Sequence, residues 1–313
     1  MRSLRVEASG LLTTVQDLGR EGFGTIGVSP SGAADPISLR LGNRLVGNVE
    51  GAAVLEMTLL GGSFVFPEGA IVALAGSDFG ARLGDAAIEP SRSVEVGPGQ
   101  KLQLGPSRSG ARCYLCVQGG IAVPPFLGSA STHLLSGLGG LDGRALRKGE
   151  VLPIGPAIEP FRKRIIAPRV AEQLSGRSVL RVTPGPQAEW FDESSLRAFY
   201  SDTYRVSEQS SRMGLRLEGP PIMQSVSKPM ITEGVALGAV QMPPGGSPII
   251  LFVEQQTTGG YPKIANVISA DLHRVGQLRP RDEIRFELVT FEAARSLLIE
   301  QENLLASPES VLE

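Results

Sequence analysis

The side chains best suited to chemistry lie in four polar, Gly-rich segments. The most informative segment, residues 254–263, follows an apolar run and gathers a carboxylate, amides, hydroxyls, a phenol and an ammonium around a turn. Such groups can bind a small polar carboxylate or amide through hydrogen bonds and charge. Turn geometry does not require Gln256, Tyr261 or Lys263, so a functional role is favoured there. In segments 13–20, 29–36 and 76–80, turn formation and ligand binding explain the residues about equally well.

Other familiar motifs lack the context that their chemistry needs. Residues 22–27 spell G-x-G-x-x-G without a strand before them or a helix directly after them, so we interpret them as a turn. Cys113 and Cys116 lie three apart in an apparent strand and point to opposite faces, which favours core packing; we expect no metal site. His133 and His273 are expected at the surface or in hydrogen bonds. Without a Walker-type phosphate loop, ATP chemistry needs another chain or an unrecognised site.

Composition narrows the class of protein. The 313 residues carry 30 Lys and Arg against 32 Asp and Glu, so the net charge of −2 provides no field for nucleic acid or an anionic membrane. Two cysteines cannot form a disulfide framework, and the first residues lack the apolar core of a signal peptide. Apolar runs fall far short of the roughly 20 residues of a spanning helix. We therefore expect a cytoplasmic protein with reduced thiols that does not cross a membrane.

The elements that must position these side chains are mainly strands. Short β-like runs bounded by Gly or Pro recur at the spacing typical of sandwiches and barrels. The expected strands are residues 63–66, 71–75, 93–96, 101–104, 112–117, 179–182, 249–253 and 283–289. Helices are few. One is expected from Pro36 to Val46 with Asp35 as its N-cap, and two more at 193–200 and 291–305.

Two domains are expected from the length and from a Pro-rich, basic stretch near the middle of the chain. We predict a first domain at 1–160, a connector at 161–176 and a second domain at 177–313 that ends in a helix. Residues 96–102 and 278–284 share the spacing of a turn between apolar positions, and residues 31–35 have a looser echo at 211–214. These two short matches favour related halves.

The chain resembles the biotin-dependent carboxyltransferase family over residues 6–288. The resemblance is carried, in order, by the phrases TTVQDLGR, GVSPSGAADP, LRLGNRLVGN, LEMTLLGG, GSDFGA, QGGIAVPPFLGS, TPGPQ, SSRMGLRLEGP and QTTGGYPKIA. That family includes one of the subunits of bacterial 5-oxoprolinase, the antagonist of the KipI kinase inhibitor and a region of urea carboxylase. The chain departs from the family pattern at Glu254, where relatives commonly carry Asp, and at Arg281, where they carry Gly.

The resemblance implies two cyclophilin-like β-barrel domains and an enzyme that works as a complex. The implied activity is ATP-dependent opening of the 5-oxoproline lactam to glutamate, together with a KipI-like 5-oxoprolinase B subunit and an A subunit. The assembled complex would use the ATP, and covalent biotin is not expected because no A-M-K-M segment occurs. The alternatives are a regulatory protein that antagonises a KipI-like kinase inhibitor and a carboxyltransferase component that acts on urea or a related amide.

Candidate roles follow from the chemistry that lactam opening requires. Arg20 or Arg212 would pair with the substrate carboxylate in a bidentate fork. Asp35, Asp78 and Glu254 are acid or base candidates, although Asp35 also suits a helix cap. The predicted catalytic residues are Asp35, Asp78, Glu254, Tyr261 and Lys263, and the predicted substrate-binding residues are Arg20, Ser31, Arg212, Gln256, Thr257, Gly259 and Gly260.

Overall fold

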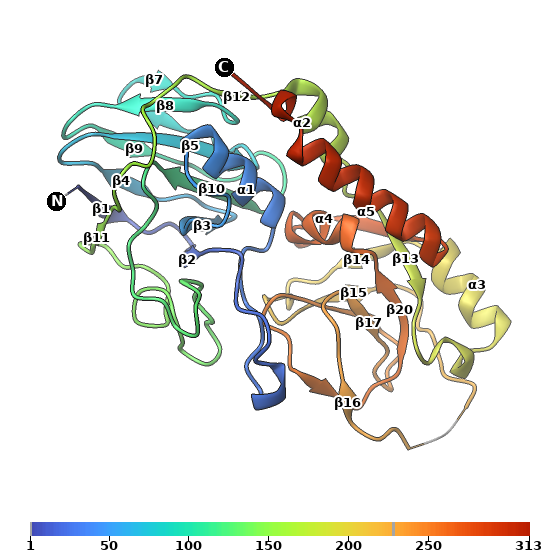
Figure 1. Cartoon of the computed structure of the whole chain (residues 1–313). Coiled ribbons are helices and arrows are strands. Elements are labelled where there is room, and N and C mark those ends of the chain that lie inside the picture. Colours follow the sequence, from blue (N-terminus) through green and yellow to red (C-terminus); the bar gives the residue numbers. More distant parts are fainter. Residues whose placement is uncertain (1, 227–228) are drawn as a thin grey trace. The chain divides into compact units, whose positions relative to one another are not determined.

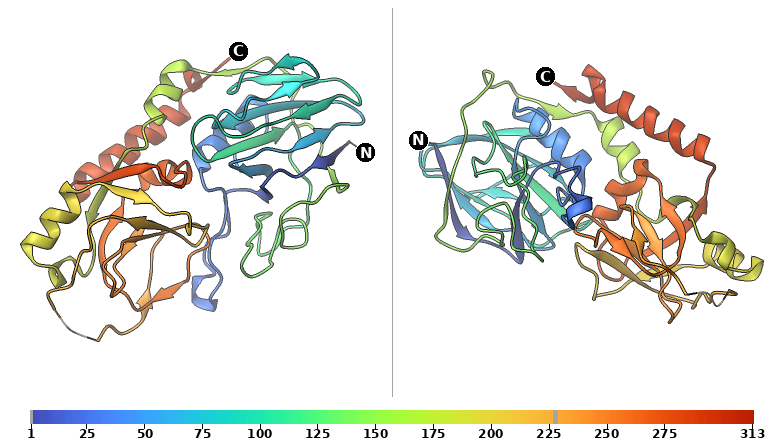
Figure 2. Two further views of the ribbon diagram at one scale, coloured as in Figure 1. Left: turned by 180° about the vertical axis from the view of Figure 1, so that it is seen from behind. Right: turned by 60° about the horizontal axis from the view of Figure 1, so that its bottom comes forward.

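The computed structural model describes residues 2–226 and 229–313 and divides the chain into two compact units (Figure 1, Figure 2). The first unit contains the chain up to Arg20, Ser31–Gln173 and Leu305–Glu313, and the second contains Glu21–Pro30 and Leu174–Leu304. The units follow the order of the predicted limits, 1–160, 161–176 and 177–313, but two segments lie outside those limits. Residues 21–30 belong to the second unit, and residues 305–313 belong to the first.

Two antiparallel sheets enclose one hydrophobic core in the first unit. Leu102 from one sheet and Leu115 from the other are fully buried in that core. The six-stranded sheet has the order β11-β1-β4-β9-β6-β7, with β1 Ser3–Ala8, β4 Ser63–Val65, β6 Arg82–Leu83, β7 Ala86–Ala87, β9 Lys101–Gln103 and β11 Val151–Pro153. The five-stranded sheet has the order β2-β3-β10-β5-β8, with β2 Leu12–Gln16, β3 Val54–Thr58, β5 Ala70–Gly76, β8 Ser93–Val96 and β10 Arg112–Val117.

Strand β10 is buried along its whole length because the core covers one face and helix α1, Pro36–Leu45, packs on the other. Cys113 belongs to the core, whereas Cys116 lies against Gly42 of α1, and both thiols are free. The prediction of core packing for this pair is therefore confirmed. Burial raises the pKa of both thiols, which keeps them protonated and unreactive near neutral pH.

The second unit contains a closed barrel of seven strands. Its order is β13-β20-β17-β18-β15-β14-β21, with β13 Val179–Pro184, β14 Tyr204–Val206, β15 Gly214–Glu218, β17 Ala239–Gln241, β18 Ile249–Leu251, β20 Lys263–Val267 and β21 Glu283–Leu288. A separate ribbon pairs β16, Glu233–Gly234, with β19, Thr258–Gly259. The predicted mainly-β class is confirmed, and each of the eight expected strands overlaps an observed one.

The three predicted helices are confirmed as α1, α3 at Glu193–Ser201 and α5 at Phe291–Ala306. Two shorter helices were not expected, α2 at Pro168–Leu174 and α4 at Leu272–Gly276. The predicted connector contains α2 and β12, Ile165–Ile166, which pairs with β22, Val311–Leu312. The 3₁₀ turns are η1 Gly24–Ile26, η2 Ala188–Trp190, η3 Ser269–Asp271 and η4 Pro308–Ser310. Thus residues 22–27 form a turn, as predicted. Across residues 2–226 and 229–313, no helix has both the length and the apolar character needed to cross a membrane.

The two turns that suggested internal similarity have the same backbone geometry. Gly99 has φ 71° and Arg281 has φ 73°, so each occupies the left-handed region. In each turn, the side chain that follows the left-handed residue accepts a hydrogen bond from a backbone N–H three positions earlier. Gln100 Oε1 accepts from the Gly97 N–H at 2.7 Å, and Asp282 Oδ2 accepts from the Arg279 N–H at 2.9 Å. The looser match does not extend to structure, because residues 31–35 lead into a helix and 211–214 into a strand.

Candidate functional site

In the first unit, the segment before α1 is held by a buried network around Tyr114. The Tyr114 hydroxyl accepts a hydrogen bond from the Asp35 N–H at 2.7 Å and donates one to Glu56 Oε2 at 2.8 Å. Glu56 Oε2 also accepts from the Ala34 N–H at 2.8 Å. Burial, followed by the charges of Glu56 and Asp35, raises the pKa of Tyr114 well above its usual value, so the phenol remains a donor.

Asp35 caps α1, which was the competing role expected for it. Its carboxylate accepts hydrogen bonds from the Ser38 N–H at 3.0 Å and the Ser38 hydroxyl at 2.6 Å. These bonds satisfy a backbone donor that the first turn of the helix leaves free. The buried carboxylate therefore already has a structural role, and an acid or base role for Asp35 stays a prediction.

Arg20 and Ser31 are both buried and both bind the irregular segment after β10. The Arg20 guanidinium donates to the carbonyl oxygens of Phe126, at 3.3 Å, and Ser131. Ser31 has φ 56°, and its hydroxyl donates to the Thr132 carbonyl oxygen at 2.7 Å. Substrate binding by either side chain would thus compete with contacts that order this loop.

Asp78 lies nearer the surface, in a tight turn. One carboxylate oxygen accepts from the Gly80 N–H at 2.7 Å, and the other accepts from Arg108 at 2.9 Å. This arrangement is an Asx turn with an ion pair at its edge. It accounts for the position of Asp78 without a catalytic role, which stays a prediction.

In the second unit, the structure brings Arg212 and Glu254 together. Arg212 Nε and Glu254 Oε1 lie 2.5 Å apart, and both side chains are buried. The Glu254 N–H also donates to the Arg212 carbonyl oxygen at 2.8 Å. A buried pair of this kind needs both partners, because removing one leaves an uncompensated charge. Arg212 could therefore bind a substrate carboxylate, and Glu254 act as an acid or base, only while keeping or exchanging this contact.

A second group of polar side chains gathers around β17 and β20 of the second unit. Lys263 Nζ binds Glu233 Oε1, which also accepts from Gln187 Nε2 at 2.9 Å. Gln187 Oε1 accepts from the Lys263 N–H at 3.1 Å. These hydrogen bonds, first from Lys263 and then from Gln187, lower the pKa of Glu233. We call Gln187, Glu233, Gln241, Gln256 and Lys263 the amide cluster.

Gln241 and Gln256 complete the amide cluster. Gln256 is exposed and donates to Gln241 Oε1 at 3.5 Å, whereas Gln241 is buried. Gly259 lies directly against Gln241 Nε2. Of the other predicted residues in this segment, Thr257 is half-buried, whereas Gly260 and Tyr261 are exposed. The amide cluster thus lies beside segment 256–261, through the pairing of Glu233 with Gly259 and the hydrogen bond of Gln241 with Gln256.

Three members of the amide cluster were not predicted: Gln187, Glu233 and Gln241. They are scattered along the sequence, and strand pairing and hydrogen bonds bring them to Lys263. The one available signal was Gln187, which ends the phrase TPGPQ. The two histidines were expected at the surface or in hydrogen bonds. Both are buried, and for His133 the expected hydrogen bond is confirmed, because its Nδ1 accepts from the Ser136 N–H at 3.1 Å.

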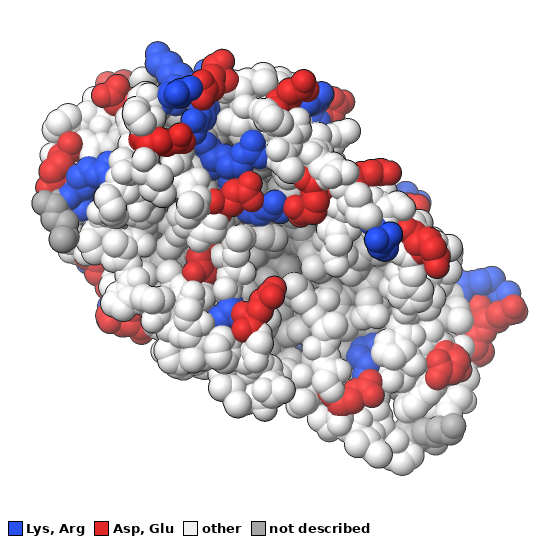
Figure 3. Space-filling view, in the orientation of Figure 1, with Lys and Arg blue, Asp and Glu red and all other residues white. Residues whose placement is uncertain are grey.

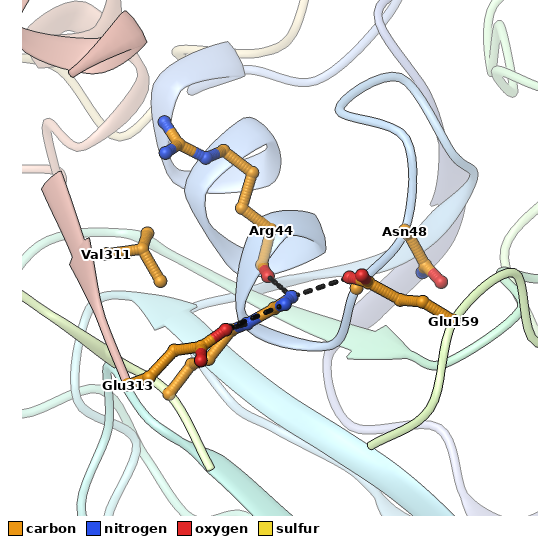
Figure 4. Close-up of a pocket in the computed structure, with 7 residues that line it drawn as sticks. Arg44, Asn48, Glu159, Val311 and Glu313 are labelled. Atoms are coloured by element: carbon orange, nitrogen blue, oxygen red, sulfur yellow. Dashed lines mark hydrogen bonds and ion pairs between the residues drawn. The ribbon is translucent and has the colours of Figure 1, made fainter. Parts of the chain in front are cut away.

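An open pocket of about 290 Å³ in the first unit is lined mainly by charged groups that bind one another (Figure 4). Arg164 donates to Glu159 at 2.7 Å and to the Arg44 carbonyl oxygen at 3.0 Å, and it pairs with Glu313 at 3.3 Å. These contacts attach the C-terminal strand to the first unit. On the face shown in Figure 3, basic and acidic side chains are interspersed.

Comparisons with known proteins give one consistent result. A model of the carboxyltransferase domain, subdomain A and B, matches residues 26–288. The chain is 40% identical over 291 residues to the C subunit of 5-oxoprolinase from Escherichia coli K12, covering 93% of each chain. The protein of the same name from Haemophilus influenzae is 36% identical, over 91% of this chain and 90% of that one. The crystal structure of K. lactis urea amidolyase matches 99% of this chain with a TM-score of 0.90 and 32% identity, although this chain spans only 21% of that one.

Proposed function

The chain belongs to the carboxyltransferase family, and from that membership we propose that it is the C subunit of a 5-oxoprolinase. The observation that carries the proposal is the 40% identity with a protein of that name over 93% of both chains. The urea amidolyase is a much longer protein, of which this chain matches about a fifth. The higher identity, 40% against 32%, therefore favours the 5-oxoprolinase assignment.

In this proposal the chain acts in a complex that opens the lactam of 5-oxoproline to give glutamate. The complex would contain a KipI-like B subunit and an A subunit, would use ATP and would act in the cytoplasm. The chain has no nucleotide motif and no biotin-attachment segment, which supports ATP binding elsewhere in the complex and chemistry without covalent biotin on this chain.

The amide cluster is the part of the chain best suited to a lactam. Lactam opening requires an electrophilic carbonyl and a substrate held in register. Gln256, Thr257 and the backbone at Gly259 and Gly260 would bind the lactam, and Lys263 would supply positive charge. Arg212 would meet the substrate carboxylate only by sharing its contact with Glu254.

The direct test is ATP-dependent release of glutamate from 5-oxoproline by the reconstituted complex, with each chain omitted in turn. We expect turnover to disappear when this chain is left out. Gln256→Ala and Tyr261→Phe should each lower kcat/KM by about tenfold or more, the usual effect of removing an oriented polar contact. The matched control is Glu95→Gln on the exposed side of β8, which should leave turnover unchanged. Effects within about twofold for both site variants would place the chemistry elsewhere.

A second candidate function is carboxyl transfer to urea or a related amide. The TM-score of 0.90 to the urea amidolyase structure favours it. Carboxylation of urea by this chain with a biotin carboxylase and a biotin carrier, without glutamate release, would select this alternative. Inactivity in both assays with tight binding to a KipI-like chain would instead select a regulatory antagonist.

A further inference from the structure

A pocket at one end of the closed barrel in the second unit is lined by charged, hydroxyl-bearing and apolar residues. Its volume of about 310 Å³ is near the lower limit for small-molecule pockets. The lining residues are Ser175, Arg177, Ser178, Leu278, Asp282 and Glu283. None of them belongs to the amide cluster, so this pocket, which we call the Arg177 pocket, is a distinct feature of the unit.

The parallel pairing of β13 with β21 brings the two parts of the lining together. The paired residues begin with Val179 and Arg285. Arg177 and Glu283 each come two residues before that pair, so they lie at the same end of neighbouring strands. Two segments that are far apart in the sequence thus supply a guanidinium and a carboxylate to one pocket.

The charges of Arg177 and Glu283 are both unpaired. Within residues 2–226 and 229–313, neither side chain forms an ion pair or a hydrogen bond. Arg205 is the cross-strand neighbour of Glu283, but its ion pair is with Glu218, at 3.7 Å. Arg177 and Glu283 therefore line one pocket without neutralising each other directly.

The charge balance of the pocket favours a ligand that carries both signs. Asp282 is engaged by Arg279, whose N–H donates to it at 2.9 Å and whose guanidinium lies 3.4 Å away. Beyond this pair, Arg177 contributes one positive charge and Glu283 one negative charge. A simple anion would be repelled by Glu283 and a simple cation by Arg177, whereas a zwitterion is attracted by both.

The lining also indicates the size and type of such a ligand. A guanidinium binds a carboxylate through two parallel hydrogen bonds, and the half-buried position of Arg177 strengthens the attraction. Glu283 is exposed and can accept hydrogen bonds from an ammonium group. Leu278 is buried and adds apolar surface, which favours a short aliphatic group on the ligand.

We propose that the Arg177 pocket binds a free α-amino acid as its zwitterion, with the carboxylate on Arg177 and the ammonium on Glu283. The small volume and the contribution of Leu278 select a short aliphatic side chain. This site is additional to the proposed lactam chemistry and does not depend on it, so the failure of one proposal leaves the other standing.

The test is an NMR titration of the isotope-labelled full chain with L-alanine near neutral pH. Propionate keeps the carboxylate without the ammonium, and ethylamine keeps the ammonium without the carboxylate. We expect a dissociation constant on the order of a millimolar for L-alanine and at least about threefold weaker binding of either analogue. Backbone amide shifts should change in residues 175–178 and 278–283. No saturable binding up to about 50 mM, equal affinities for the three compounds, or shift changes only elsewhere would overturn the inference.

Variants give a second readout. Arg177→Gln and Glu283→Gln should each weaken L-alanine binding at least about threefold without lowering the Tm, because neither side chain has an ion pair to lose among the described residues. The matched control is Arg295→Gln, which changes an exposed arginine of α5 and should leave the affinity unchanged. Unchanged affinity in either folded pocket variant, or an equal loss in the control, would overturn the inference. If neither pocket variant folds, the comparison of the three ligands decides.

Discussion

At the scale of single residues, Tyr114 and Tyr204 are both fully buried but differ in what their hydroxyls do. The Tyr114 hydroxyl links the Asp35 N–H to Glu56, whereas the Tyr204 hydroxyl has no hydrogen-bond partner in the described residues. Removing the first hydroxyl breaks two buried hydrogen bonds, whereas removing the second breaks no hydrogen bond among the described residues.

We therefore predict opposite results for the same substitution. Tyr114→Phe should lower the free energy of unfolding by about 1–3 kcal/mol, and Tyr204→Phe should leave it unchanged or raise it slightly. Urea denaturation of both variants, followed by circular dichroism, measures the difference. Equal losses would show that the hydroxyl contacts do not control stability at these positions.

The hydrogen bonds to Glu233 should make the stability of the protein depend on pH. Its pKa is lowered in the folded protein by hydrogen bonds from Lys263 and Gln187, so folding favours the ionised form. The resulting stability is present above the ordinary value of 4.5 and is lost as the pH falls through the lower, folded value. The free energy of unfolding, measured from about pH 6 to about pH 3, should therefore fall less steeply for Glu233→Gln than for the parent chain. Glu95→Gln, on an exposed carboxylate, should follow the parent; identical slopes for all three would contradict the prediction.

Sequence reasoning found the polar segments but only part of the amide cluster. Lys263 and Gln256 stood out because turn geometry does not require them. Gln187, Glu233 and Gln241 did not, because common polar residues far apart in sequence carry no sign that strand pairing and a bulge will bring them together.

At the scale of elements, the turns at Gly99 and Arg281 use one conformation with different residues. A non-glycine residue in the left-handed region is strained. A Cβ at Gly99 would meet no atom within 4 Å, so backbone strain alone would determine the free-energy cost of replacing this glycine.

Exchanging the residue types should shift stability in opposite directions. Arg281→Gly should stabilise the protein by about 0.5–1 kcal/mol relative to Arg281→Ala, and Gly99→Ala should destabilise it by about 1 kcal/mol. The Ala variant is the matched control because it also removes the exposed ion pair between Arg281 and Glu208. Thermal unfolding of the three variants tests this, and a less stable Arg281→Gly than Arg281→Ala would contradict it.

Elements with local signals were predicted best. The Asp35 cap and Pro36 identified the start of α1, and Gly47 follows its end with φ 72°. Helix α2 was missed because the prolines around it and the basic run before it suggested a connector. Its first position is itself a proline, which is compatible with a helix start.

At the scale of the whole molecule, the last residues of the chain return to the first unit. Residues 305–313 contribute β22, which pairs with β12, and the buried Ser310 hydroxyl donates to the Leu305 carbonyl oxygen at 3.0 Å. No local signal announces a contact between positions about 145 residues apart, so the sequence indicated two domains but not this exchange.

Ending the chain after Leu304 should therefore destabilise the first unit, which lies mostly before residue 174. We expect a lower Tm and earlier exposure of the 161–173 region to protease, because β12 loses its partner. The control Glu313→Gln keeps the strand and weakens only the ion pairs of Glu313 with Arg162 and Arg164, so it should lower the Tm less than the truncation does. A truncated chain as stable as the full one would show that β22 is dispensable.

The return of the C-terminal segment also determines how the protein would respond to force. Strands β1 and β22, near the two ends of the chain, both belong to the first unit. When the ends are pulled apart, tension cannot reach the barrel of the second unit until β22 has peeled away from β12. We therefore expect the antiparallel pair β12–β22 to bear an applied load before the second unit, which contains the amide cluster, does.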